Sequence, residues 1–193
     1  MPDSLNGVND WKAYIISDFN TIPHTVYEVL LSFFCIGTIA IMVFYRKKGA
    51  RHIVRLLFLE YLFFVYGLTV IFRQGNGSTL HLTPFWNYAS AFKDEDARGL
   101  YEIVMNVVLF VPIGFLLGTQ CSRWPQKKQW RVVLLFGIGL STGIELLQLL
   151  FKKGTTELDD VIHNTLGCLT GFLIWRGSSW LVDTIKKRPK VKA

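Results

Sequence analysis

Cysteine and histidine are scarce in this chain, which has three cysteines and four histidines. Cys35, Cys121 and Cys168 lie in or beside apolar runs and form no CxxC or CxxH spacing. A disulfide framework and a transition-metal site are therefore not expected, and we predict no metal and no cofactor. Nucleophile-elbow, HExxH and phosphate-loop motifs are also missing, so no motif assigns an enzyme class.

Apolar residues, in contrast, are abundant: 51% of the chain is hydrophobic. Several runs approach the roughly 20 apolar residues that cross about 30 Å of hydrocarbon. The first 26 residues are polar and mixed in charge, so we expect the first apolar segment, and no cleavable signal peptide, to direct insertion. The sequence predicts an all-α, polytopic helical membrane protein with about five transmembrane helices, multi-pass in the cell (plasma) membrane.

We divide the chain into four parts. Residues 1–25 are expected to form an extracytoplasmic, interfacial amphipathic segment, with a flexible tail as the alternative. Residues 26–72 hold two N-terminal transmembrane helices, at about 26–45 and 53–72, and residues 176–193 form a basic cytoplasmic tail. Residues 73–175 hold three further spans, at about 100–118, 132–150 and 161–175. The last span is short, so a re-entrant piece is its alternative.

The distribution of positive charge predicts the orientation. With five spans, 15 of the 21 Lys and Arg residues fall on one side of the membrane. Because cytoplasmic loops carry the excess of positive charge, the amino terminus is expected outside and the carboxyl terminus inside. A re-entrant fifth segment would leave the basic tail outside, which argues against it. The net charge of +7 is thereby explained without a nucleic-acid partner.

Polar side chains recur on one face of each of the last three spans. Ser141, Glu145 and Gln148 are spaced by four and three residues, which places them on one helical stripe. Ionisable groups inside hydrocarbon cost several kcal/mol and indicate a functional site by default. Helix rise puts the groups at similar depth beneath the outer surface. The predicted ligand-binding residues are Arg73, Asn106, Glu145, Gln148, Asp159, Asp160 and Asn164, of which Glu145 and Asp160 are the catalytic candidates.

These spans also carry GxxxG pairs, which permit close helix approach. The pairs are Gly114/Gly118, Gly139/Gly143 and Gly167/Gly171. The same polar groups have a structural interpretation. Asn106, Gln148 and Asn164 are suited to interhelical hydrogen bonds, and an Arg73–Glu145 pair would satisfy both charges without any chemistry.

The paired acids Asp159 and Asp160 have two interpretations. Carboxylates are ligands that Mg²⁺ and Ca²⁺ accept, so a divalent-cation site is one of them. Acids at a helix start also stabilise the helix dipole, which is the ordinary role. For the neighbouring His163, on another face from Asn164, we expect a structural role.

The blocks after residue 73 resemble those of the VanZ-like membrane proteins. They are an Arg leaving a helix before Pro-Phe (Arg73, Pro84, Phe85), N-x-x-x-F-x-P-x-G (Asn106 to Gly114), I-E-x-x-Q (Ile144 to Gln148) and D-D-x-x-x-N-x-x-G (Asp159 to Gly167). The resemblance covers residues 73–175. It departs from the family at Lys152-Lys153-Gly154, where relatives usually carry Gly-Arg, so a basic group is kept without a bidentate guanidinium.

The resemblance implies a phenotype, low-level resistance to the lipoglycopeptide antibiotic teicoplanin, and no mechanism. Our first hypothesis is binding or alteration of a lipid-linked cell-wall precursor or of the lipoglycopeptide at the outer leaflet. The alternative is an intramembrane hydrolase or transferase acting on a lipid-linked substrate, with Glu145 as general base and Asp159/Asp160 holding a divalent cation. A third possibility is a scaffold whose polar layer only fixes helix packing. The lipid bilayer is a partner in every case, and the oligomeric state is left open.

Overall fold

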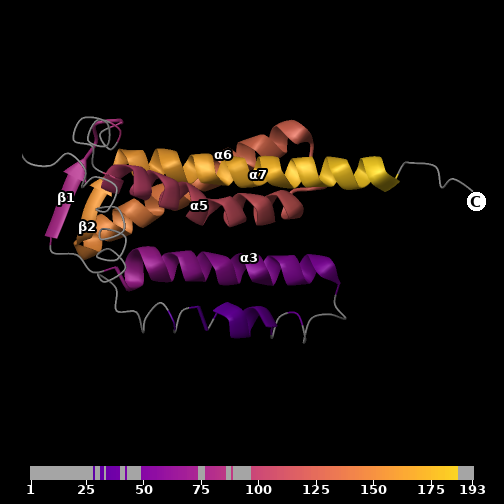
Figure 1. Cartoon of the computed structure of the whole chain (residues 1–193), viewed down its shortest axis with the longest axis horizontal. Coiled ribbons are helices and arrows are strands. Elements are labelled where there is room, and N and C mark those ends of the chain that lie inside the picture. Colours follow the sequence, from indigo (N-terminus) through magenta and orange to yellow (C-terminus); the bar gives the residue numbers. More distant parts are fainter. Residues whose placement is uncertain are drawn as a thin grey trace, which may run out of the picture.

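The computed structural model describes residues 49–73, 77–85 and 97–186, together with 28, 31–32, 34–39, 42 and 88. The interfacial segment expected at 1–25, much of the first span and the basic tail from residue 187 lie outside these residues. Within the first span, residues 34–39 are helical. Figure 1 shows long helices lying side by side, with two short strands at one end of the bundle.

The second span is helix α3, Ala50–Tyr66, which continues as a π-helical segment, η1, over Gly67–Ile71. The apolar run LLFLEYLFFVY favours a helix that is buried on one side and faces lipid on the other. The segment ends where the amide of Phe72 donates to the carbonyl of Gly67 over 3.0 Å. Arg73 follows Phe72 directly, so the end of η1 fixes the position of the Arg73 backbone. The predicted helix at about 53–72 is confirmed.

The third, fourth and fifth apolar runs form α5 (Ala97–Gln120), α6 (Gln126–Phe151) and α7 (Leu158–Lys186). Among the described residues, three helices are long and apolar enough to cross a membrane: Ala50–Ile71, Glu102–Gln120 and Gln126–Phe151. Helix α7 is not one of them. Asp159 and Asp160 lie in its first turn, and Arg176, Asp183 and Lys186 lie in its second half. Three spans are supported in this way, and the five-span topology with its orientation stays a prediction.

A two-stranded sheet closes one end of the bundle. Strand β1 (Gly77–His81) pairs in parallel with β2 (Lys153–Glu157), with Thr79 opposite Thr155. The two threonine hydroxyls are 2.9 Å apart and hydrogen-bonded. The all-α prediction holds for the mostly helical chain but missed this sheet. Each strand is too short and too polar to show a period-two pattern, and its partner lies on a distant loop.

Glycines bring α5 and α7 into close contact. A Cβ at Gly167 or Gly171 would collide with the carbonyl oxygens of Val107 and Val111 on α5. In return, a Cβ at Gly118 would lie 2.7 Å from the Trp175 ring. The predicted close approach through the glycines of these two helices is confirmed.

The third glycine pair behaves differently. Gly139 and Gly143 meet no described heavy atom within 4 Å, so the prediction that they mediate close packing is wrong. The contact of α6 with α7 is made by Gly137 instead, where a Cβ would lie 3.2 Å from that of Cys168. The buried stripe of α6 contains Gly137, Ser141 and Glu145. Gly139 and Gly143 lie on another side of the helix, away from α7.

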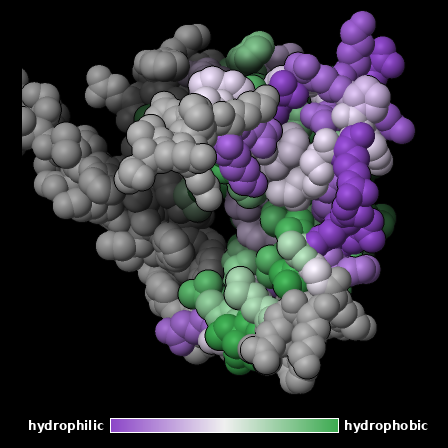
Figure 2. Space-filling view, turned by 90° about the vertical axis from the view of Figure 1, so that its right-hand side faces the viewer, coloured by the Kyte–Doolittle hydropathy of each residue, from purple (hydrophilic) through white to green (hydrophobic). Residues whose placement is uncertain are grey.

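The surface of the bundle fits a lipid environment. Large apolar side chains stand out from the sides of the helices, among them Leu135 (67% exposed) and Leu150 (72% exposed) on α6. Figure 2 looks onto the end away from the sheet, where hydrophilic side chains gather over part of the face. Exposed Lys127, Lys128 and Lys186 lie toward that end, at the start of α6 and the end of α7. An apolar belt and a hydrophilic end are the features of a membrane protein.

Candidate functional site

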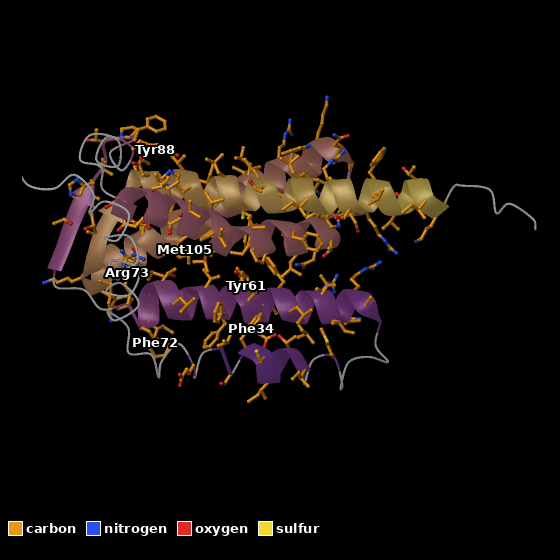
Figure 3. The ribbon with its side chains drawn as sticks, in the orientation of Figure 1. Phe34, Tyr61, Phe72, Arg73, Tyr88 and Met105 are labelled. Atoms are coloured by element: carbon orange, nitrogen blue, oxygen red, sulfur yellow. The ribbon has the colours of Figure 1, made fainter. Side chains whose placement is uncertain are left out.

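Polar side chains from four elements meet at the sheet end of the bundle, where Figure 3 labels Arg73, Tyr88 and Met105. Four of them are buried, namely Ser141, Glu145, Gln148 and Asn164, and the other three are partly buried. We call this group the polar layer: Arg73 after η1, Asn106 on α5, Ser141, Glu145 and Gln148 on α6, and Asp160 and Asn164 on α7. Six of the seven predicted ligand-binding residues lie in it.

A chain of hydrogen bonds crosses three helices in this layer. The Asn106 amide donates to the Asp160 carboxylate over 2.6 Å, which joins α5 to α7. The Ser141 hydroxyl lies 3.4 Å from the carbonyl of Asp160 and accepts a 2.8 Å hydrogen bond from the Asn164 amide. Ser141 was not among the predicted ligand-binding residues. Its position four residues before Glu145 was the available signal, because that spacing places both on the same stripe.

Glu145 is buried beneath the strand that follows its own helix. Its Oε2 accepts a 3.1 Å hydrogen bond from the backbone N–H of Glu157, and its carbonyl accepts one from the Thr156 hydroxyl. Only 4% of the residue is exposed. Strand β2 therefore folds back over the end of α6 and holds this carboxylate in place.

Gln148 contacts the π-helical segment. Its amide donates a 2.9 Å hydrogen bond to the carbonyl of Thr69, whose own hydroxyl is bonded to Val65. A π-helical turn shifts carbonyls out of the regular ladder, and such turns are frequent at functional sites. The Oε1 of Gln148 and the Oδ1 of Asn164 are buried and have no hydrogen-bond partner among the described residues. The NH₂ group of Gln148 thus links α6 to η1, and that of Asn164 links α7 to α6. The amide oxygen of each side chain can still accept a hydrogen bond.

Arg73 is the cation of the layer and stands against the turn that begins β2. Gly154 has a φ of +111°, which L-residues with side chains rarely adopt, and a Cβ there would lie 3.5 Å from the Nε of Arg73. The charge of Arg73 acts on both Glu145 and Asp160. Lys153 is held nearby, because its Nζ donates to the carbonyl of Ile71 over 3.3 Å. The dibasic segment that replaces the family's Gly-Arg therefore lies beside Arg73.

The two neighbouring acids of α7 point to different partners. Asp159 accepts a 2.6 Å hydrogen bond from the backbone N–H of Phe85, which has a positive φ of 63°. Its side chain therefore holds the loop after β1, whereas that of Asp160 faces Asn106. No group of three His, Cys, Asp or Glu side chains suited to a metal ion occurs in the described part of the chain. The divalent-cation role of the acidic pair, and with it the enzymatic alternative, stays a prediction.

His163 belongs with Asp159 rather than with the polar layer. It lies one turn further along α7, is fully buried, and its Nε2 is 3.1 Å from the hydroxyl of Tyr88. The Tyr88 and His163 rings also pack with centroids 5.4 Å apart. The Tyr88–His163 pair and the Asp159–Phe85 hydrogen bond therefore attach the segment after β1 to the start of α7.

Acids outnumber bases around Asp160. The charges of Glu145, Glu157 and Glu102 act on it with like sign, and that of Arg73 with opposite sign. Such a site supplies carboxylate oxygens that accept hydrogen bonds from hydroxyl or amino groups. The Arg73 guanidinium of the same site can pair with a phosphate or carboxylate in a bidentate manner.

Comparisons with known proteins agree with the blocks that carry this layer. The VanZ/LLP1 family model matches residues 58–182, which include the whole polar layer. The chain is also 30% identical over 131 residues to Protein VanZ of Enterococcus faecium, across 67% of this chain and 72% of that protein. No solved structure matches. The chain belongs to the VanZ/LLP1 family.

Proposed function

We propose that this membrane protein gives low-level resistance to lipoglycopeptide antibiotics such as teicoplanin. It does so by binding or altering a cell-envelope precursor, or the antibiotic itself, at the outer leaflet of the plasma membrane. Family membership and similarity to Protein VanZ support the link to glycopeptide resistance. The observation that carries the binding site is the half-buried Arg73, which lies against Gly154 beside the buried Glu145 and the half-buried Asp160.

The chemistry of the layer supports binding of a molecule that is both anionic and rich in hydroxyl or amide groups. Arg73, with Lys153 beside it, meets a phosphate or carboxylate, because guanidinium matches either group in a bidentate geometry. Glu145 and Asp160 accept hydrogen bonds from sugar or peptide donors. The unpartnered acceptors of Gln148 and Asn164 add two more positions of the same kind. Lipid-linked wall precursors combine these groups, and their heads lie at the outer membrane surface.

The test is the teicoplanin and vancomycin susceptibility of a host that expresses wild type, Arg73→Ala, Arg73→Lys or Asp160→Asn at matched membrane abundance. Arg73→Ala should return teicoplanin susceptibility to that of the host without the protein, since a charge-assisted hydrogen bond contributes about 1.5–3 kcal/mol, or at least tenfold in binding. Arg73→Lys should retain part of the protection. The exposed Arg123→Ala is the control that should protect like wild type.

Two results contradict the proposal. Protection that survives Arg73→Ala in well-expressed protein removes the arginine from the site. Loss of protection that follows only the loss of protein from the membrane assigns the layer to helix packing instead.

A further inference from the structure

An apolar groove of about 550 Å³ lies between the N-terminal helical segment, α3 and α5. Phe34, Leu57, Tyr61, Pro112, Phe115 and Leu116 form most of its wall. The volume is in the range of roughly 300–1,000 Å³ that is usual for ligand pockets. Pro112 has no N–H to donate, so it interrupts the hydrogen-bond ladder of α5 within this wall.

The polar atoms in the wall are already used. The hydroxyl of Thr38 donates to the Glu60 carboxylate over 3.0 Å, and that of Tyr61 donates to the carbonyl of Leu109 over 2.9 Å. Neither hydroxyl proton is left for a ligand. Because an unpaired polar group is costly in such surroundings, the groove is suited to hydrocarbon.

The groove is connected to Arg73 along α3, because Leu57 and Tyr61 in its wall precede Arg73 by 16 and 12 residues. On α5, Val111 and Leu116 follow Asn106 by five and ten residues, so they lie about 7 to 15 Å further along the helix axis, on another side of α5. Figure 3 shows Arg73 and Met105 at the sheet end, and Tyr61 and Phe34 further along α3 and the N-terminal segment. Both α3 and α5 belong to the helices apolar enough to span the membrane. A lipid whose head reaches Arg73 would therefore extend its tail in the direction of the groove.

We propose that the groove seats the hydrocarbon tail of an anionic lipid whose phosphate is held by Arg73. This inference rests on the proposed function, because the head of that lipid occupies the polar layer. It adds the substrate class: a phosphate-headed lipid, recognised by head and tail together. Charge complementarity at Arg73 distinguishes this occupant from a zwitterionic bulk lipid, whose tail the groove alone would accept equally well.

The experiment uses the full-length protein in phosphatidylcholine nanodiscs. One probe is phosphatidic acid with a photoreactive diazirine in one acyl chain, and the other is phosphatidylcholine with the same chain. After irradiation, peptide mass spectrometry should map the phosphatidic acid probe to groove residues of α3 and α5. Its labelling should exceed that of the phosphatidylcholine probe about tenfold, the difference that one charged hydrogen bond makes.

Leu116→Trp tests the tail site and Arg73→Ala tests the head site, with Leu59→Trp as the control. Leu116→Trp fills the groove and should abolish groove labelling, while Leu59→Trp, on an exposed part of α3, should leave it unchanged. Arg73→Ala should reduce phosphatidic acid labelling to the phosphatidylcholine level. Equal labelling by both probes, or labelling that Leu116→Trp does not change, would overturn the inference.

A short-chain phosphatidic acid, titrated by intrinsic tryptophan fluorescence, tests head recognition independently. If it binds in an Arg73-dependent manner but the long-chain probe does not label the groove, the tail site is rejected and the proposed function stands. If it binds Arg73→Ala as tightly as wild type, head recognition fails and the proposed function fails with it.

Discussion

The side-chain amide of Asn106 on α5 donates a 2.6 Å hydrogen bond to the carboxylate of Asp160 in the first turn of α7. The backbone carbonyl of Asp160 also lies 3.4 Å from the hydroxyl of Ser141 on α6. Three helices are therefore joined at the level where the ligand is proposed to bind. A change at this junction should affect stability and binding in separable ways.

Asn106→Ala should lower the free energy of unfolding by about 1–3 kcal/mol, because it removes the donor of the partly buried hydrogen bond to the Asp160 carboxylate. Asp160→Asn should cost less, since its amide oxygen can still accept from Asn106. Thermal unfolding in detergent can be followed with a thiol-reactive dye in a Cys35→Ser background, because Cys35 is exposed whereas Cys121 and Cys168 are buried and free.

Thr142→Ala is the matched control, being one residue from Ser141 but exposed. It should unfold like wild type. If Asp160→Asn proves as destabilising as Asn106→Ala, then the charge of Asp160, and not the hydrogen bond, holds the junction.

Gly171→Ala should destabilise the α5–α7 pair by about 1–3 kcal/mol, the usual cost of overpacking, because its Cβ would collide with the carbonyl of Val111. Gly139→Ala should be neutral or stabilising by up to about 1 kcal/mol, since no described atom lies near that position and alanine favours the helix. The same unfolding assay compares them. Equal destabilisation by both would contradict the arrangement in which Gly137, not Gly139, faces α7.

Much of the helical framework follows from the sequence, because long apolar runs bounded by charge specify helices that the bilayer requires. The stripe of Ser141, Glu145 and Gln148 was predictable for the same reason: its spacing fixes one face, and all three are buried. GxxxG spacing was less informative. It identifies a narrow helix surface but not whether a neighbour covers it, as Gly139 and Gly143 show.

The sheet and the partners of individual acids were beyond the sequence. Pairing of β1 with β2 depends on contacts between residues more than 70 positions apart, such as Thr79 and Thr155. Asp159 and Asp160 are adjacent in the chain, yet helical geometry turns them about 100° apart, so one meets Phe85 and the other Asn106. Adjacency in the sequence therefore did not reveal that the two acids contact different elements, and their shared role in one site stays a prediction.

Gly154→Ala should weaken binding more than it weakens the fold. The substitution strains a backbone with φ +111°, and a shift that relieves this strain moves the segment that the Arg73 guanidinium contacts, whose Nε lies 3.5 Å from the added Cβ position. Gly49→Ala is the matched control, because its φ is +93° but nothing lies within 4 Å of its Cβ position among the described atoms. Both variants should lose about 1 kcal/mol of stability from strain. Only Gly154→Ala should raise teicoplanin susceptibility, and equal protection by the two would separate Arg73 from the function.

The predicted orientation, amino terminus outside and carboxyl terminus inside, can be tested with single cysteines in a Cys35→Ser background, where the remaining thiols are buried. A membrane-impermeant maleimide should label Leu82→Cys, in the exposed segment after β1, in intact cells. It should label Arg123→Cys, between α5 and α6, only after the cells are permeabilised, because the basic excess keeps that loop inside. The reverse pattern would place the polar layer at the cytoplasmic surface. A site there has no access to envelope precursors displayed outside or to antibiotics arriving from outside, so this result would reject binding at the outer leaflet while leaving the fold unchanged.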